Sequence, residues 1–502
     1  SSLSKLSVRA MKTIQITAVD NVAVALHPIA KGEQIEAGGQ TIEVREEIPQ
    51  GHKIAVKAIE NGGNVVKYGF PIGHATKEVE AGEWVHTHNM ATNLEGEMEY
   101  RYEPALHFPK PAEPELFQGY RRKDGRAAIR NEIWVIPTVG CVNDVAKKIV
   151  KDNQSLVQGS IDGLYTFPHP FGCSQTGHDH AQTRKLLASL VRHPNAGAVL
   201  VVSLGCENLT HEQFLKELGD YDTERVKFLI CQEAEDEFTE AERLLKECVR
   251  YASVFVREPI PVSELVIGMK CGGSDGFSGI TANPLVGKFS DLLISKKGTT
   301  ILTEVPEMFG AETLLMNRCE NRELFDETVK LINDFKQYFK DNHQTIYENP
   351  SPGNKKGGIS TLEDKSLGCT QKSGSAPVRG VLAYGQRVEK VGLNLLSAPG
   401  NDLVASTALA ASGAHIVLFT TGRGTPFASP VPTVKISSNS ALAGKKKNWI
   451  DFNAGVLVED KDIDETAQEL FDYVVAVASG KKVCSEEAGF HDMAIFKQGV
   501  TL

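Results

Sequence analysis

Short apolar runs and regularly spaced glycines characterise residues 11–94. An apolar residue, two others, glycine, two others and a second apolar residue recur four times, at 29–35, 48–54, 59–65 and 79–85. Glycine permits the positive φ of a tight turn, and the valines and isoleucines on either side favour strands. The pattern predicts a small all-β domain built from hairpins.

From residue 119 onward, short continuous apolar runs alternate with amphipathic segments. We expect strands at 133–136, 198–203, 226–230, 266–269, 300–303, 393–396 and 416–419. We expect helices at 142–150, 233–250, 278–297, 321–339, 402–412 and 463–479. Apolar strands separated by helices are typical of parallel sheets buried on both faces. The sequence therefore predicts a large α/β body of mostly parallel βαβ units.

Proline-rich segments divide the chain. Four prolines within 95–118 disfavour both helix and sheet, so we expect an extended linker there. The Glu-Pro-Ile-Pro segment at 258–261 favours a division of the body into domains at 119–260 and 261–502. The polar, glycine-rich segment 341–378 is expected to be a long loop over the site. Residues 1–10 lack the apolar core of a secretory signal and are left outside the domains.

Charge and cysteine content narrow the possible partners. The formal net charge is −10, which argues against the basic face that nucleic acid requires. No apolar run reaches the length of about 18 residues that a membrane-spanning helix needs. Nine cysteines without a secretory signal predict reduced thiols in the cytoplasm. We expect a small anionic molecule and further copies of the same chain as partners, with no nucleic acid and no membrane.

The dipeptide Gly-Cys occurs four times, and an amide side chain always follows two residues later. We predict that each dipeptide ends a strand, where ligands of α/β proteins collect, and that the amides bind substrate hydroxyls. These amides are Asn143, Gln175, Asn208 and Gln371. The alternative is structural, with cysteine as a small buried residue and glycine in a tight turn. A thiolate-held iron–sulfur cluster is a third interpretation, which no C-x-x-C spacing supports.

Two histidines near the end of the β domain are candidate metal ligands. His86 and His88 stand at i and i+2, and on a strand such residues point to the same face. Neutral imidazole binds iron, manganese or zinc, although the pair also suits an exposed strand without metal.

Four further side chains are candidates for catalysis or substrate binding. His52 and Lys53 beside a turn are candidates for the base or acid, and Tyr68 adds a phenol. Arg423 lies between two glycines after an expected strand, and a guanidinium can bind a carboxylate through two hydrogen bonds.

Several long strings resemble the altronate/galactarate dehydratase family. They are Pro-Thr-Val-Gly-Cys-Val-Asn at 137–143, Cys-Gly-Gly-Ser-Asp-Gly at 271–276, and the segments 193–200, 278–284, 347–354 and 366–372. The resemblance covers nearly all of 11–502 and implies that the β domain is of the SAF type, a β-clip. The segments 85–89 and 492–500 resemble the altronate branch.

The resemblance implies a hydro-lyase that uses iron(II) or manganese(II). The expected reaction dehydrates D-altronate to 2-dehydro-3-deoxy-D-gluconate in hexuronate breakdown, with galactarate as the alternative substrate. An alternative of another class is a sugar-acid binding protein without turnover. We expect a metal held by His86 and His88 to stabilise the charge that develops when a base removes the proton beside the carboxylate. The site is expected at the junction of the β domain and the body.

Overall fold

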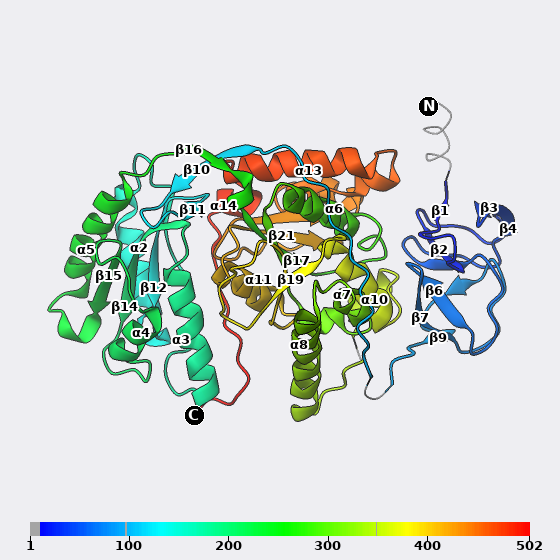
Figure 1. Ribbon diagram of the computed structural model, residues 1–502, viewed down its shortest axis with the longest axis horizontal. Helices are drawn as coiled ribbons and strands as arrows, with labels where there is room; N and C mark the ends of the chain where they lie inside the picture. The colour runs from blue at the N-terminus through cyan, green and yellow to red at the C-terminus, as the bar shows by residue number, and fades with distance from the viewer. Residues whose placement is uncertain (1–10, 96–97, 348) are drawn as a thin grey trace.

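The computed structural model describes residues 11–95, 98–347 and 349–502, so residues 1–10 and part of the expected linker lie outside it (Figure 1). The N-terminal domain contains only strands. Its four-stranded antiparallel sheet has the order β1 (Thr13–Ile14), β2 (Val22–Ala25), β5 (Lys53–Ala55) and β8 (Trp84–Val85). A hairpin and a three-stranded sheet complete it, with β3 (Gln34–Ala37), β4 (Gln40–Glu43), β6 (Asn64–Lys67), β7 (Phe70–Ala75) and β9 (Met90–Ala91).

The second domain is built on a four-stranded parallel sheet. The strand order is β13 (Gly163–Thr166), β12 (Glu132–Pro137), β14 (Ala196–Ser203) and β15 (Val226–Ile230). Its helices are α2 (Asn143–Asp152), α3 (Gly177–Val191), α4 (His211–Leu218) and α5 (Glu237–Ala252). Every residue of β12 and β14 is buried, which explains their continuous apolar sequences. A small antiparallel sheet joins β11 (Ala127–Ala128), β10 (Leu116–Arg121) and β16 (Glu258–Pro261).

The C-terminal domain contains a seven-stranded parallel sheet. The strand order is β19 (Val378–Leu382), β20 (Gly392–Leu396), β18 (Thr299–Leu302), β17 (Val266–Cys271), β21 (Ile416–Thr421), β22 (Thr433–Ser437) and β23 (Phe452–Asn453). The long helices are α6 (Ala282–Ser295), α8 (Arg322–Asp341), α11 (Asp402–Ala411) and α13 (Ile463–Ala478). Short helices are α7 (Glu312–Met316), α9 (Pro352–Lys356), α10 (Leu362–Thr370), α12 (Ser440–Lys445) and α14 (Cys484–Glu487). The predicted fold class, a small β domain followed by a mostly parallel α/β body, is confirmed.

Two segments differ from the sequence expectation. Segment 341–378 is not a long loop, because it forms α9 and the almost wholly buried α10. Its polar residues suggested solvent, but Glu363 and Asp364 are buried and hydrogen-bonded. Strand β10 begins at Leu116, inside the stretch expected to be linker, whereas residues 98–115 form neither helix nor strand.

The three domains lie in a row, with the C-terminal domain between the other two (Figure 1). The β domain packs beside α7 and α10, where Tyr68 shares an apolar cluster with Ala311 and Leu367. Its other contact places Val24 and Leu26 against Phe277. In the described ranges, no helix combines the length and apolar character needed to cross a membrane.

Candidate functional site

One buried carboxylate joins the β domain to the C-terminal domain. Asp364 in α10 accepts hydrogen bonds from Lys53 Nζ at 3.0 Å and from Lys67 Nζ at 2.9 Å. All three side chains are at most 3% exposed. Burial alone would raise the pKa of Asp364, but the two ammonium groups outweigh burial and hold the pKa below its usual range. Buried charges are tolerated only when they are paired, so this triad fixes where the β domain packs against the C-terminal domain. We call this contact, made by Lys53, Lys67 and Asp364, the seat of the β domain.

The two lysines of the triad have different surroundings. Lys53 Nζ also donates to the Gly358 carbonyl at 2.8 Å, and complete burial lowers its pKa to about 8. For Lys67, burial would lower the pKa, but Asp364 and Tyr68 raise it above its usual range. Lys67 and Tyr68 line a cavity, whereas Lys53 does not. Lys53, predicted as a catalytic group, is thus placed between the domains, and Lys67 meets a carboxylate that lies 297 residues away in the sequence.

Both ring nitrogens of His52 take part in hydrogen bonds. Its Nε2 lies 2.9 Å from the Lys356 carbonyl oxygen, and its Nδ1 lies 3.2 Å from Trp84 Nε1. The carbonyl can only accept and the indole can only donate, so His52 is neutral with its proton on Nε2. Burial lowers its pKa, which also favours the neutral form. In this arrangement His52 has no free lone pair with which to take a proton.

The two candidate metal ligands do not lie on one strand. Strand β8 ends before them and residues 86–89 form a turn, so the expectation that both rings share a strand face is wrong. The buried His86 ring stacks on Trp84 and lies 4.7 Å from the ring of His52, while His88 is exposed. Burial lowers the pKa of His86 to about 3, and its Nδ1 is buried without a hydrogen-bond partner. Over the described ranges, no group of three or more His, Cys, Asp or Glu side chains is placed to hold a metal ion. The pair therefore does not fit an ion.

A small cavity lies beneath the seat of the β domain. Its volume of about 10 Å³ has room for roughly one water. Tyr68 reaches into it beside Gly279, where an added Cβ would stand 1.8 Å from the phenol oxygen. Burial raises the pKa of Tyr68 to about 12, so the phenol stays protonated at neutral pH. The lining residues are Lys67, Tyr68, Ser274, Asp275, Ser278, Gly279, Asn283, Ile359, Asp364, Lys365, Gly368 and Cys369.

A larger pocket opens from the same place to solvent. Its volume is about 370 Å³, and it lies between residues 26–27 and 50–51 of the β domain and the strand ends of the C-terminal domain. Lys356 and the exposed Arg423 place two cations in its lining, which also contains the carboxylates of Asp275 and Glu459. Asp275 lines this pocket and the small cavity, and its carboxylate accepts hydrogen bonds from Ser438 Oγ at 2.8 Å and Asn439 Nδ2 at 3.0 Å. The pocket suits a small anion that carries hydroxyl groups.

A second buried charge network lies at the same strand ends. Lys270 Nζ is 2.9 Å from Glu304 Oε2 and 3.0 Å from Asp402 Oδ1. The sulfurs of Cys271 and Cys369 are 3.3 Å apart, and the hydrogen bond from Cys369 lowers the pKa of Cys271 to about 7. Lys270 and Asp402 were not predicted, because single charged residues at scattered positions give no local signal.

One of the four Gly-Cys dipeptides departs from the prediction. Cys369 belongs to helix α10 rather than to a strand end, so the expectation for this dipeptide is wrong. The amide that follows it, Gln371, donates to the Leu367 carbonyl at 3.2 Å and lines neither junction pocket. It therefore caps its own helix.

The other three dipeptides follow strands β12, β13 and β14, as predicted. Their amides hold the loops together in the second domain. Asn143 Nδ2 donates to the His169 carbonyl at 2.8 Å, Asn208 Oδ1 accepts from Ser174 N at 2.8 Å, and Gln175 Oε1 accepts from Gly172 N at 3.1 Å. The structure thus brings His52, Lys53, Tyr68 and Arg423 to the domain junction, but it places Asn143, Gln175 and Asn208 in another domain.

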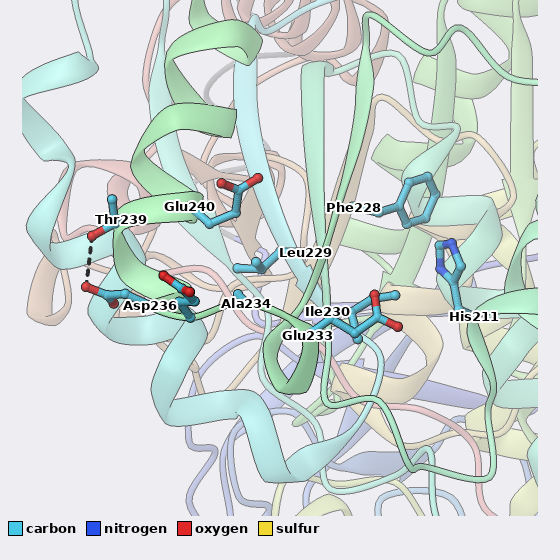
Figure 2. Close-up of a pocket in the computed structure, with 10 residues that line it drawn as sticks. His211, Phe228, Leu229, Ile230, Glu233, Ala234, Asp236, Thr239 and Glu240 are labelled. Carbon is cyan, nitrogen blue, oxygen red and sulfur yellow. Dashed lines mark hydrogen bonds between the residues drawn. The ribbon is translucent and has the colours of Figure 1, made fainter.

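The largest of the described pockets lies away from these groups. It has a volume of about 800 Å³ beside β15, where Figure 2 shows Glu233 beside His211, with Asp236 and Glu240 on the opposite side of the pocket. Thr239 Oγ1 donates to Asp236 at 2.8 Å. A lining rich in carboxylates repels an anionic ligand. The charges of the two linings therefore favour the smaller pocket, between the β domain and the C-terminal domain, as the site for an anion. We call it the junction pocket.

Three family models match successive parts of the chain. The model described as "Altronate/galactarate dehydratase SAF domain" matches residues 11–93. "D-galactarate dehydratase/Altronate hydrolase, second domain" matches 119–253, and "D-galactarate/Altronate dehydratase, C-terminal" matches 262–501.

Curated relatives match over almost the full chain. Altronate dehydratase of Escherichia coli (strain K12) is 53% identical over 98% of this chain and 100% of its own length. Altronate dehydratase of Bacillus subtilis (strain 168) is 54% identical over 97% and 99%. Galactarate dehydratase (L-threo-forming) of E. coli K12 is 33% identical over 96% of each. The chain belongs to the altronate/galactarate dehydratase family.

Proposed function

We propose that this chain is a hydro-lyase that dehydrates D-altronate to 2-dehydro-3-deoxy-D-gluconate in hexuronate breakdown. The observation that carries the proposal is the identity of 53–54% to two altronate dehydratases over nearly the whole chain. The galactarate dehydratase is only 33% identical, which makes galactarate the second candidate. A binding protein without turnover is disfavoured because the relatives are enzymes over the same length.

The junction pocket is the proposed substrate site. Arg423 binds the sugar-acid carboxylate through two hydrogen bonds, and Lys356 adds a second positive charge. Ser440 lines the same pocket and can bind a hydroxyl group. This arrangement leads the substrate toward the small cavity, where the buried polar groups converge.

The proton transfers are assigned to Asp275 and Tyr68. Asp275 lines both hollows, so its carboxylate can meet the carbon next to the substrate carboxylate and take its proton. Tyr68 keeps its phenol proton because its pKa is raised to about 12, so it can donate to the departing hydroxyl. Lys67 stays protonated beside them and stabilises the developing negative charge. In this scheme His52 and Lys53 act by holding the β domain against the C-terminal domain.

The enzyme is also proposed to require iron(II) or manganese(II), as the family resemblance implies. A bound divalent ion would act as a Lewis acid and stabilise negative charge on the substrate. His86 offers one free ring nitrogen but no neighbouring set of ligands, so the histidine pair is not assigned to the ion.

A product assay tests the proposal. The reduced protein, supplied with ferrous iron, is incubated with altronate and separately with galactarate, and the 2-keto-3-deoxy acid is quantified. We expect product from altronate at a rate at least about tenfold above that from galactarate, and loss of that rate with a chelator. Binding of altronate without formation of a keto acid would refute the enzyme and favour the binding protein.

A cytoplasmic location and assembly into a homo-oligomer complete the proposal. All nine cysteines are free thiols, which suits a reducing compartment. Fractionation of the cells that make the protein and light scattering of the purified chain test the two statements.

A further inference from the structure

Three thiols converge at one edge of the second-domain sheet. Strands β13, β12 and β14 are neighbours and run parallel, so the loops that follow them meet at the carboxyl edge. Cys173, Cys141 and Cys206 lie in these three loops, one in each. Parallel strand ends are a common place for ligands in α/β proteins.

Hydrogen bonds tie the three loops to each other. Gly140 N donates to the Phe171 carbonyl at 2.9 Å, which joins the loop after β12 to the loop after β13. Asn208 Oδ1, two residues after Cys206, accepts from Cys173 Sγ at 3.2 Å. At Gly172 an added Cβ would stand 2.0 Å from the Thr138 carbonyl oxygen, so these backbones touch. The three thiols are therefore held in one small region.

The three thiols are also exposed, which is unusual for cysteine. Cys141, Cys173 and Cys206 are exposed, whereas four other cysteines of the chain are buried. Free cysteine is among the residues most often buried, and exposed thiols are prone to oxidation. Three exposed thiols on three adjoining loops are therefore candidates for binding one common ligand.

The arrangement of the three thiols does not suit a single ion. A tetrahedral ion binds sulfur at about 2.3 Å, which brings its thiolates to within about 4 Å of one another. Among the residues that the structure describes, no such set of three ligands occurs. A four-iron cluster binds each thiolate through a different iron, so its cysteines stand farther apart.

The surroundings of these thiols suit a negatively charged cluster. Helices α2, α3 and α4 begin at Asn143, Gly177 and His211, shortly after the three cysteines, so the partly positive ends of three helices face the edge. Gln232 Nε2 donates to Cys206 Sγ at 3.3 Å. Gln175 Nε2 is buried and has no hydrogen-bond partner within the described residues. Amide donors near sulfur stabilise the reduced, more negative cluster.

We infer that Cys141, Cys173 and Cys206 together hold a four-iron, four-sulfide cluster, in which one iron has no cysteine ligand. Equal amounts of ferrous and ferric iron combine with inorganic sulfide, and the three thiols release their protons as they bind. No net electron transfer is needed. The open iron is free to take water or an oxygen of a small anion. This inference concerns bound iron and sulfide and does not depend on the proposed substrate.

The test is reconstitution of the full chain without oxygen. Ferrous iron, ferric iron and sulfide are added under a thiol reductant, excess is removed, and iron, sulfide and visible absorbance are measured. We expect about four irons and four sulfides per chain, with the charge-transfer absorbance of thiolate-bound iron. Iron bound without sulfide would overturn the inference.

Serine variants identify the ligands. Each of Cys141→Ser, Cys173→Ser and Cys206→Ser should lower bound iron and sulfide at least about tenfold. Cys231→Ser is the matched control, because Cys231 follows β15 at the same edge and is half-buried. Unchanged cluster content in all three variants, or its loss in Cys231→Ser, would refute the assignment.

Alkylation of the unmutated chain provides an independent measurement if a variant fails to fold. The reconstituted and metal-free proteins are treated with iodoacetamide and the modified cysteines are located by mass spectrometry. We expect the cluster to protect Cys141, Cys173 and Cys206 and to leave the labelling of Cys484 unchanged. Equal labelling of the three thiols with and without the cluster would contradict the inference.

Discussion

The seven-stranded sheet of the C-terminal domain and the four-stranded sheet of the second domain both carry cysteine at their carboxyl edges, but in opposite environments. At the first, the β domain covers the strand ends, and Cys271 is buried among ion pairs such as Lys270 with Glu304. At the second, Cys141 and Cys206 are exposed. The same topology gathers polar groups in both cases. Whether another domain covers the edge decides if those groups pair with each other or stay available to a ligand.

The largest expected effect comes from removing the carboxylate at the covered edge. Asp364→Ala leaves Lys53 and Lys67 buried without a counter-charge, so the free energy of unfolding should fall by about 3–5 kcal/mol. Urea denaturation measures the loss. The control is Asp152→Ala, whose exposed carboxylate also pairs with a lysine, at 2.7 Å, and whose loss should cost at most about 1 kcal/mol. Similar losses in both variants would mean that coverage of the edge has no energetic consequence.

Next in size is the loss of the buried phenol. Tyr68→Phe should lower kcat for altronate about 10²-fold because the proposed proton donor is gone, while the ring still fills its place. KM and the melting temperature should change little. Steady-state kinetics measure the effect, and Tyr120→Phe in the second domain serves as the control. An unchanged kcat would mean that the proton donor is another group, away from the strand ends that the β domain covers.

A smaller effect is expected at the pocket mouth. Arg423→Ala should raise KM for altronate about tenfold with little change in kcat, because a charged hydrogen-bond partner of the carboxylate is lost. Arg423→Lys should recover part of the affinity, since lysine keeps the charge but loses the two-pronged geometry. Equal KM values in all three proteins would place the carboxylate elsewhere.

The smallest effect is a dependence of stability on pH. The pKa of Asp364 is lower in the folded chain than the value of about 3.9 in an unfolded one, so its contribution is present above that value and is lost as pH falls through the folded pKa. Between about pH 5 and pH 3, the unmutated chain should lose more stability than Asp364→Asn. Denaturation curves at each pH measure the difference. Parallel losses in the two proteins would show that this carboxylate titrates normally.

Regular features of the sequence predicted most of the fold. The expected strand at 226–230 coincides with β15, and the expected helix at 463–479 differs from α13 by one residue. Buried parallel strands are recognisable because their apolar runs are local. Segment 341–378 was misassigned because its polar residues are paired with partners far along the chain.

The candidate site was predicted less completely, for the same reason. Asp364 meets Lys53 across 311 residues, and no local pattern reports such a pairing. The Gly-Cys dipeptide was informative where it followed a buried strand, as at Cys141. It misled at Cys369, where the same two letters lie inside a helix.

The irregular segment at residues 98–115 has a consequence for how the β domain stays in place. A tether of this kind keeps its two ends at an effective concentration in the millimolar range, so a domain that detaches meets its seat again at once. If the chain were cut there, the seat would become an encounter between two separate molecules. Its occupancy would then depend on how much protein is in solution, and dilution alone would empty it.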